Sequence, residues 1–308
     1  MNTKKVACID LGSNSCRLRI ADENGQVIYQ NSKATKLGEG LFETGNLIEP
    51  SIKRGLDTLG EYAKIMKEHE VQNYRAVATA ACRTAKNGKE FATLVKLKTG
   101  LDLEIIDTLE EARLNLKGAL LNAPQNKKYA VVYDLGGAST EITLARIDGH
   151  ILHTISIPWG ARNSSEAYDL KEFDEAKAEH LKEDIQKYVS DFVLDAHLEK
   201  YKSDCALIAT SSTPLRLCSM VKKDESYSRE KNDGACVKCC ELDGAVLMIE
   251  NMSVEERSKS AYIGEDRAPI FAAACVIFKA IYDKLGFDEL IVSFKGAQDA
   301  MLKELQHG

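Results

Sequence analysis

Two short turns in this 308-residue sequence carry the residue types that bind phosphate. The first reads DLGSNS from Asp10, and the second reads DLGGAS from Asp134. Glycine at the tight positions lets backbone N–H groups converge on an anion, and a serine hydroxyl adds a donor. An aspartate beside a phosphate is repelled unless a cation lies between them, so each turn predicts a phosphate site with a Mg²⁺ ion.

The two turns belong to an internal repeat. A shift of 124 residues aligns six identical pairs, namely Asp10, Leu11, Gly12, Ser15, Ala21 and Gly25 with Asp134, Leu135, Gly136, Ser139, Ala145 and Gly149. A single turn of this kind is more often an ordinary surface turn that caps its own backbone. Repetition in register favours a duplicated phosphate site. Each copy reads as strand, turn and strand, which predicts a β-hairpin.

The elements around these turns alternate between helix and strand. Apolar residues at three- and four-residue spacing predict helices within 50–66, 91–99, 171–197, 269–285 and 296–305. Short apolar runs predict strands at 74–80, 103–107, 205–210 and 289–293. We therefore expect an α/β fold of two lobes, 1–122 and 123–308, joined through 122–128, with the last helix free to pack back on the first lobe.

Composition limits the class of protein. Hydrophobic residues make up 44% and charged residues 29%, and the net charge is −6. This balance argues against nucleic acid as a partner. The longest apolar run, 270–278, is about half of a bilayer span, and no signal peptide is evident, so we expect no membrane partner and a cytoplasmic location. Nine irregularly spaced cysteines favour reduced thiols, with a zinc site at the 236–240 cluster as the weaker alternative.

Motifs along most of the chain resemble the exopolyphosphatase/guanosine pentaphosphate phosphohydrolase family. IDLGSNSCRLRI resembles its first phosphate loop and YDLGGASTEITL its second. VATAACRTAKN resembles the stretch with a substrate-facing arginine, and EIIDTLEEARLNLKGAL the stretch with the catalytic glutamate. SIPWGARN and IATSSTPLR follow in the expected order. The resemblance implies a duplicated ribonuclease H-like fold of the actin, hexokinase and heat-shock ATPase superfamily, with the active site between two lobes.

The resemblance also implies roles for particular residues. Glu111 corresponds to the glutamate that activates the attacking water, and Arg83 to the arginine that faces the substrate. Asp134 and Glu141 correspond to carboxylates that hold Mg²⁺, and Glu141 is also placed in the catalytic set. The phosphate-binding set comprises Asp10, Gly12, Ser13, Asn14, Ser15, Arg17, Gly136, Gly137, Ala138 and Ser139.

The residue types support several of these roles independently. A helix that begins near Glu111 keeps its first-turn carboxylates ionised, and an ionised carboxylate can accept a proton from water. The alternative is an ordinary first-turn pair, Glu110 and Glu111. The guanidinium of Arg83 suits phosphate oxygens, whereas its alternative is a solvated arginine. Arg17, at the repeat position of Glu141, is either a phosphate contact or a partner for a nearby acid. Serine nucleophiles are disfavoured, because no His/Asp base is evident beside them.

Three departures from the family pattern concern glycine. Ala138 stands where the family has a third glycine, and requires a negative φ. Asp107 and Thr108 replace a Ser-Gly pair. The segment 211–214, SSTP, replaces a glycine turn expected to approach a phosphate or nucleotide. We also expect the segment 221–234 to be a solvated loop.

The leading functional hypothesis is an exopolyphosphatase, a hydrolase that removes terminal phosphate from inorganic polyphosphate with Mg²⁺ and a glutamate-activated water. Short chains are expected to be preferred, because the sequence resembles the short, two-domain members. Guanosine pentaphosphate is the alternative substrate, and a phosphate-ligand sensor without turnover is a third reading. The sequence leaves the oligomeric state open, with a homodimer among the options.

Overall fold

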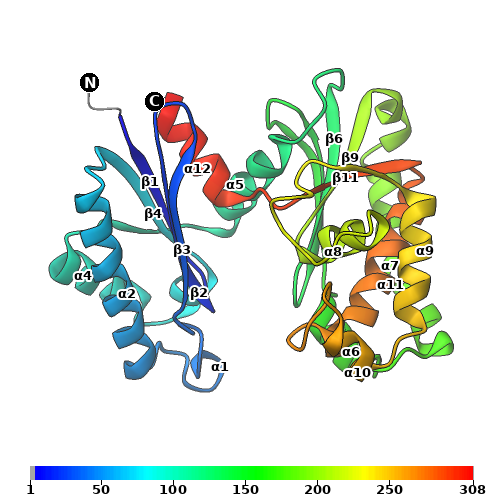
Figure 1. The fold of residues 1–308 in the computed structure, drawn as a ribbon, viewed down its shortest axis with the longest axis horizontal. Helices are drawn as coiled ribbons and strands as arrows, with labels where there is room; N and C mark the ends of the chain where they lie inside the picture. Colours follow the sequence, from blue (N-terminus) through cyan, green and yellow to red (C-terminus); the bar gives the residue numbers. More distant parts are fainter. Residues whose placement is uncertain (1–3, 308) are drawn as a thin grey trace. The chain divides into compact units, whose positions relative to one another are not determined.

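The computed structural model describes residues 4–307 and divides the chain into two compact units (Figure 1). Unit 1 comprises Met1–Gly118 and Gly296–Gly308, and unit 2 comprises Ala119–Lys295. The chain thus enters unit 2 four residues before the boundary expected from the sequence. The last helix, α12 (Ala297–His307), belongs to unit 1.

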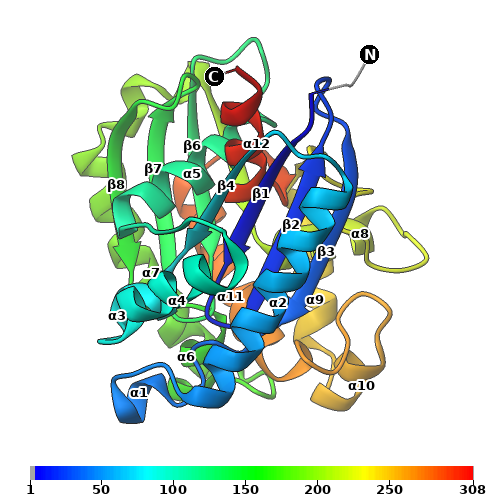
Figure 2. The same ribbon diagram turned by 90° about the vertical axis from the view of Figure 1, so that its left-hand side faces the viewer.

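Unit 1 is a five-stranded sheet with helices on both faces (Figure 2). Its strands, in the order β3-β2-β1-β4-β5, are β1 (Val6–Leu11), β2 (Ser15–Ala21), β3 (Val27–Ala34), β4 (Asn73–Ala78) and β5 (Leu103–Ile105). Its other helices are α1 (Leu41–Thr44), α2 (Glu49–Glu68), α3 (Ala80–Thr84), α4 (Gly88–Thr99) and α5 (Thr108–Leu120). Tyr62 of α2 and Phe91 of α4 pack into the core on one face, and Leu114 of α5 and Met301 of α12 into the core on the other.

Unit 2 contains a six-stranded sheet in the order β10-β11-β9-β6-β7-β8. The strands are β6 (Tyr129–Leu135), β7 (Thr140–Arg146), β8 (Ile151–Ile157), β9 (Cys205–Thr210), β10 (Cys236–Lys238) and β11 (Glu289–Ser293). The helices are α6 (Ala161–Ala167), α7 (Glu175–Asp195), α8 (Ser212–Val221), α9 (Cys239–Glu250), α10 (Val254–Lys259) and α11 (Ala268–Leu285), with short 3-10 turns at Leu198–Lys200 and Lys202–Asp204. Figure 1 shows α7, α9 and α11 side by side over this sheet.

The sequence repeat is a structural repeat. In each unit three antiparallel strands are followed by a parallel strand beside the first, giving β3-β2-β1-β4 and β8-β7-β6-β9. The register pairs Asp10 with Arg17 in unit 1, and Asp134 with Glu141 in unit 2. The predicted duplicated α/β fold is therefore confirmed, together with both hairpins.

Two predictions from the sequence need correction. The helix expected from Lys171 begins at Glu175, because the side chain of Asp174 accepts a hydrogen bond from the Lys177 N–H at 2.9 Å and caps the helix. The 221–234 segment, expected to be a solvated loop, is not simply solvated, since Asp224 and Asn232 are buried within it. The Asn232 amide donates to the Asp224 carboxylate at 2.6 Å and so holds the segment together.

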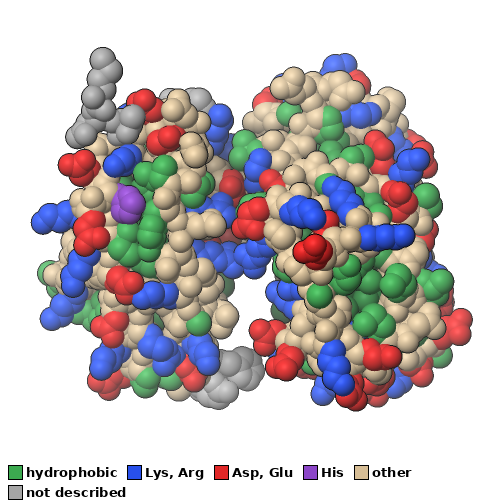
Figure 3. Space-filling model, viewed as in Figure 1, with side chains coloured by type: hydrophobic (Ala, Val, Ile, Leu, Met, Phe, Trp, Pro, Cys, Tyr) green, Lys and Arg blue, Asp and Glu red, His purple; other side chains and the backbone are tan. Residues whose placement is uncertain are grey.

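The surface carries acidic and basic side chains interspersed on both units in the view of Figure 3. This distribution agrees with the small net charge of −6. Among residues 4–307, no helix is long and apolar enough to cross a membrane.

Ser211, at the turn between β9 and α8, has a backbone conformation that suits glycine. Its φ is 90° and its ψ is 179°, a backbone region that residues other than glycine rarely adopt. Its hydroxyl is also buried without a hydrogen-bond partner in the described part of the chain. The SSTP segment, 211–214, therefore keeps the backbone turn expected of glycine, and the backbone of Ser211 is strained as a result.

We expect Ser211→Gly to raise the free energy of unfolding by about 1 kcal/mol, because it removes the strain and the unpaired hydroxyl. Urea denaturation would measure the change. Ser212→Gly is the matched control; Ser212 is the first residue of α8, where glycine should lower stability by roughly 0.5 kcal/mol. Equal destabilisation by both substitutions would contradict the assignment of strain to Ser211.

Candidate phosphate site

The two phosphate turns are built in the same way. In unit 1 the Gly12 N–H donates to the Ser15 carbonyl at 2.9 Å, and in unit 2 the Gly136 N–H donates to the Ser139 carbonyl at 2.9 Å. A Cβ on Gly136 would lie 2.9 Å from the Ser139 oxygen, closer than such contacts normally occur, so this position requires glycine. The sequence repeat therefore preserves one specific turn, closed by the same hydrogen bond in both copies.

Loop 1, residues 12–15, is held by the segment that follows β3. The Lys36 N–H donates to the Asn14 carbonyl at 2.9 Å, and the Gly38 N–H donates to the Ser13 carbonyl at 2.8 Å. In a trans peptide the N–H points opposite to the C=O. The Asn14 N–H, which shares a peptide with the Ser13 carbonyl, is therefore aimed away from this segment.

Loop 2, residues 136–139, is held in the same manner by the segment after β8. The Ala161 N–H donates to the Gly136 carbonyl at 3.0 Å, and the Arg162 N–H donates to the Gly137 carbonyl at 2.8 Å. Among residues 4–307, no backbone carbonyl outside the strand ladders accepts from the N–H groups of Gly137, Ala138 and Ser139. Three adjacent donors on one side of a turn form the arrangement that binds a phosphate oxygen.

The alanine of loop 2 fits this arrangement. Ala138 is not among the non-glycine residues with positive φ, so its methyl group causes no backbone strain. A Cβ on Gly137 would meet no atom within 4 Å, which shows that the protein itself leaves space above that residue. Gly160 packs underneath, since a Cβ there would lie 2.6 Å from the Ala138 nitrogen. Loop 2 is thus tightly packed on one side and open on the other.

Four charged groups of unit 1 lie near loop 1. Arg17 Nη1 lies 3.8 Å from an Asp10 carboxylate oxygen, and Arg83 donates to Glu111 Oε2 at 2.8 Å and to the Ile106 carbonyl at 3.1 Å. Burial raises the pKa of Asp10, the Arg17 charge opposes this, and the Glu111 charge adds to it. The sequence-predicted Asp10, Arg17, Arg83 and Glu111 are therefore neighbours in the fold.

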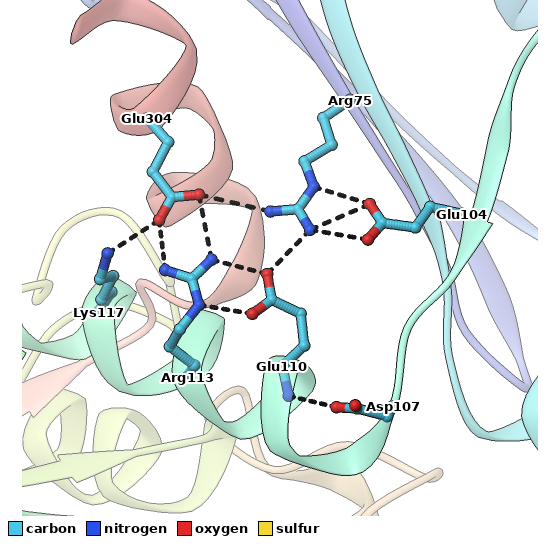
Figure 4. A network of polar contacts seen from close by, with 7 residues as sticks. All are labelled: Arg75, Glu104, Asp107, Glu110, Arg113, Lys117 and Glu304. Carbon is cyan, nitrogen blue, oxygen red and sulfur yellow. Dashed lines mark hydrogen bonds and ion pairs between the residues drawn. The ribbon is translucent and has the colours of Figure 1, made fainter. Parts of the chain in front are cut away.

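The two adjacent glutamates at the start of α5 have different surroundings. Glu110 belongs to an ion-pair network with Arg75, Arg113 and Glu304, which ties α5 to β4 and α12 (Figure 4). Hydrogen bonds from Arg113, together with the Arg75 guanidinium, lower the pKa of Glu110 to about 2. Within the described part of the chain, Glu111 has one ion pair, with Arg83. Glu110 is thus a structural residue, and Glu111 is the one whose charge acts on Asp10.

Asp107 explains one of the departures from the family pattern. Its carboxylate accepts a hydrogen bond from the Glu110 N–H at 2.8 Å (Figure 4), and its carbonyl accepts one from the Glu111 N–H at 3.1 Å. The first contact satisfies an N–H group in the first turn of α5 that has no partner within the helix, and the second is the first backbone hydrogen bond of the helix itself. The aspartate therefore fixes the start of the helix that carries Glu111.

In unit 2 two hydroxyl groups hold Glu141. Ser139 donates to Glu141 Oε1 at 2.6 Å, and Ser156 donates to the same oxygen at 3.1 Å. Asp134 lies opposite Glu141 in the β6–β7 register. The two carboxylates therefore stand at neighbouring positions beside loop 2, and the contacts to Oε1 leave Oε2 available as an acceptor.

The sequence did not identify Ser156, or Asn163, whose side-chain amide donates to the Ala138 carbonyl at 2.9 Å. Ser156 pairs with Glu141 across β7 and β8. Extending the repeat by one more strand and reading its register would have pointed to Ser156. Asn163 has no such signal, because its position depends on how α6 packs.

The fold and these loops define a class of protein: two duplicated α/β units of the actin-like type, each with a phosphate-binding turn after its first strand. The model of the Ppx/GppA phosphatase family matches residues 18–307. The chain belongs to this family.

Three relatives are similar to this chain over nearly its whole length. The chain is 30% identical over 302 residues to a bifunctional 3-dehydroquinate synthase/phosphatase of Fusobacterium nucleatum, covering 93% of this chain and 44% of that protein. It is 26% identical to exopolyphosphatase 2 of Mycobacterium tuberculosis, covering 95% and 96%. It is also 26% identical to a guanosine-5′-triphosphate,3′-diphosphate pyrophosphatase of Pseudoalteromonas atlantica, covering 96% and 57%.

A solved structure supports the fold throughout. The Ppx/GppA family member of Aquifex aeolicus is similar with a TM-score of 0.86 and 28% identity, covering 99% of this chain and 98% of that one. The actin-like fold implied by the sequence motifs is consistent with this similarity.

The different environments of the two glutamates predict a specific pH effect. The pKa of Glu110 is lower in the folded state than in the unfolded chain, so the ionised Glu110 side chain stabilises the fold above pH 4.5. This stabilisation is lost as the pH falls towards about 2. We expect Glu110→Gln to remove this part of the pH dependence, worth roughly 1 kcal/mol for a partly exposed ion pair.

Urea denaturation between pH 7 and about pH 2 would measure the effect. Glu179→Gln, at an exposed ion pair of α7, serves as the control and should leave the profile nearly unchanged. If the Glu110 and Glu179 variants give the same profile as the wild type, the network does not stabilise the start of α5.

Proposed function

We propose that this protein is an exopolyphosphatase, which hydrolyses the terminal phosphoanhydride bond of inorganic polyphosphate. The observation that carries the proposal is the contrast between the two glutamates of α5. Glu110 is fixed in a structural network, whereas the charge of Glu111 acts on Asp10 and its one ion pair among the described residues is with Arg83. A carboxylate with one exchangeable partner beside a phosphate loop is suited to act as a general base.

In the proposed reaction Arg83 exchanges its partner. A substrate phosphate offers oxygens that compete for the guanidinium, since planar N–H donors bind phosphate as well as carboxylate. Glu111 is then free to accept a proton from water as the water oxygen attacks the terminal phosphorus. The bridging phosphorus–oxygen bond breaks, orthophosphate is released, and the shortened chain keeps the bridging oxygen. The guanidinium of Arg83 stabilises the charge that develops on the transferred group.

In unit 2, the residues of loop 2 are suited to bind a phosphate group of the substrate. The N–H groups of Gly137, Ala138 and Ser139 supply donors, and the strand register places Asp134 and Glu141 beside them. Mg²⁺ fits this donor set, because it commonly binds through one or two carboxylates together with phosphate oxygens and water. Bound there, Mg²⁺ would neutralise charge on the phosphate oxygens. Ser156 and Ser139 orient Glu141 for this role.

Guanosine pentaphosphate is the second candidate substrate. One relative is named as a guanosine-5′-triphosphate,3′-diphosphate pyrophosphatase. Removal of the terminal phosphate of guanosine pentaphosphate would use the same attack of water on a phosphoanhydride. Competition between guanosine pentaphosphate and polyphosphate for hydrolysis would show that both use one site.

We expect Glu111→Gln to reduce the rate of phosphate release from polyphosphate by about a hundredfold or more, because it removes the base without changing side-chain size. A colorimetric phosphate assay would measure the rate. Glu90→Gln, in the first turn of α4, is a matched control for a helix-start glutamate outside the site and should retain activity. Unchanged release by the Glu111 variant would remove Glu111 from the mechanism.

We expect Ser156→Ala to raise the Mg²⁺ concentration for half-maximal activity by about tenfold, because the hydroxyl orients a metal ligand. At saturating Mg²⁺ the rate should largely recover. Thr154→Ala, on the same face of β8 and bonded to Thr143 rather than Glu141, is the control. A Mg²⁺ titration identical in the wild type and both variants would argue against Glu141 as a ligand.

A further inference from the structure

A groove in unit 2 is lined by residues of α7, α9 and α11, and we call it the α11 groove. Its volume is about 390 Å³, and its apolar lining comes from Phe173, Ala178, Leu247, Val276 and Ala280. Helices α7 and α9 both pack against α11, whose buried Val276 and Ala280 form the floor. A concave surface of this size, with an apolar lining and a few convergent polar groups, is typical of binding sites.

Helix α9 extends this apolar surface outwards. Leu247 and Met248 are 59% and 60% exposed, and Gly244 and Cys240 are exposed one and two turns earlier. Residues three or four apart share one face of a helix, so these four form a stripe along α9. A Cβ on Gly244 would meet no atom within 4 Å, which leaves room for close approach. Figure 3 shows hydrophobic side chains gathered on this part of unit 2. Exposed apolar surface that continues into a groove marks an interaction site.

The lysines of the groove already have acidic partners. Lys182 lies 3.0 Å from a Glu179 oxygen. Lys279 lies 2.5 Å from an Asp243 oxygen and 2.9 Å from an Asp283 oxygen. Lys182 and Lys279 are therefore held by carboxylates of their own surroundings.

Two glutamates of the groove have no such partner. In the part of the chain that the structure describes, neither Glu175 nor Glu250 has an ion pair or a side-chain hydrogen bond. Burial raises the pKa of Glu250, the Lys279 charge opposes this, and the Glu175 charge adds to it. An ionised carboxylate that is half buried without a donor is destabilised, and a cation beside it removes this penalty. The groove therefore combines an apolar lining with uncompensated negative charge.

The stripe and the groove together match the shape of an α-helix. From Cys240 to Met248 the stripe extends about 12 Å, at about 1.5 Å per residue. An amphipathic helix laid along α9 would cover it with apolar residues at three- and four-residue spacing. A lysine or arginine on the flank of that helix would supply the cation that Glu250 and Glu175 lack.

A second copy of this chain matches the surface less well. A symmetric contact would bring Glu175 and Glu250 of one copy towards the same residues of the other around the two-fold axis. Like charges repel, and such a contact supplies no cation for Glu250. Charge complementarity thus favours a basic partner over self-association.

We propose that the α11 groove and the stripe of α9 form a docking surface for a basic amphipathic helix of another protein. Leu247 and Met248 pack against the apolar face of that helix, and Glu250 pairs with one of its lysines or arginines. Docking uses no residue of loops 1 and 2, so the proposal stands independently of the hydrolase activity.

The test uses two fluorescein-labelled synthetic peptides of about five helical turns. The basic peptide has leucine at three- and four-residue spacing and lysine on the flanks, and the acidic peptide has glutamate in place of each lysine. Fluorescence anisotropy would measure their binding to the full chain. We expect the basic peptide to bind about tenfold more tightly than the acidic one, or better.

Glu250→Gln should weaken binding of the basic peptide about tenfold, because it removes the ion pair. Glu199→Gln makes the same change of charge in an exposed 3-10 turn of unit 2, where Glu199 pairs with Lys202. This control should bind the peptide within about twofold of the wild type.

Leu247→Ser should weaken the same binding about fivefold or more, because the helix then covers less apolar surface. Leu194→Ser is the matched control, since Leu194 of α7 is 69% exposed and lies outside the groove. It should bind the peptide within about twofold of the wild type.

Several outcomes would overturn the proposal. These are equal effects of the two glutamate substitutions, equal effects of the two leucine substitutions, tighter binding of the acidic peptide, and no binding of the basic one. Sedimentation equilibrium of the chain alone tests the other occupant. A dimer that Leu247→Ser dissociates and Leu194→Ser does not would show that a second copy fills the groove, and would also overturn the proposal.

Discussion

The hydrogen bonds that fix the carbonyls of the two loops are the constraint on which the candidate site depends. Each peptide has a donor and an acceptor on opposite sides, so anchoring the carbonyls from below directs the amides outward. In unit 1 the anchor is the segment after β3, and in unit 2 it is the segment after β8. A phosphate-binding turn therefore requires the third strand of each meander, because that strand delivers the anchoring segment.

Duplication supplied the same framework twice, but the side chains on it have diverged. The position opposite the first aspartate is Arg17 in unit 1 and Glu141 in unit 2. An arginine there partly neutralises Asp10, whereas a glutamate adds a second acid beside Asp134. The two copies are thus suited to different tasks, one with basic groups and a candidate base, the other with paired carboxylates.

Much of this could be predicted from the sequence, and the reasons differ by element. The hairpins and their turns were predictable because glycine, serine and alternating apolar residues determine local geometry. The strand β3 was not, since its residues are mostly exposed and show no apolar alternation. The different surroundings of Glu110 and Glu111 could not be predicted, because they depend on contacts between segments far apart in the chain. Whether both loops act on a single ligand stays a prediction.

The chain leaves unit 1 after Gly118 and returns to it at Gly296, so that all of unit 2 is inserted before α12. Residues such as Met301 complete the apolar face that Leu114 and Val6 begin. During synthesis on the ribosome that face stays open until the inserted unit has been made, and closing it requires contacts between residues very distant in sequence. Unit 2, being continuous, can fold first, and its folding would bring the two ends of unit 1 into reach of each other.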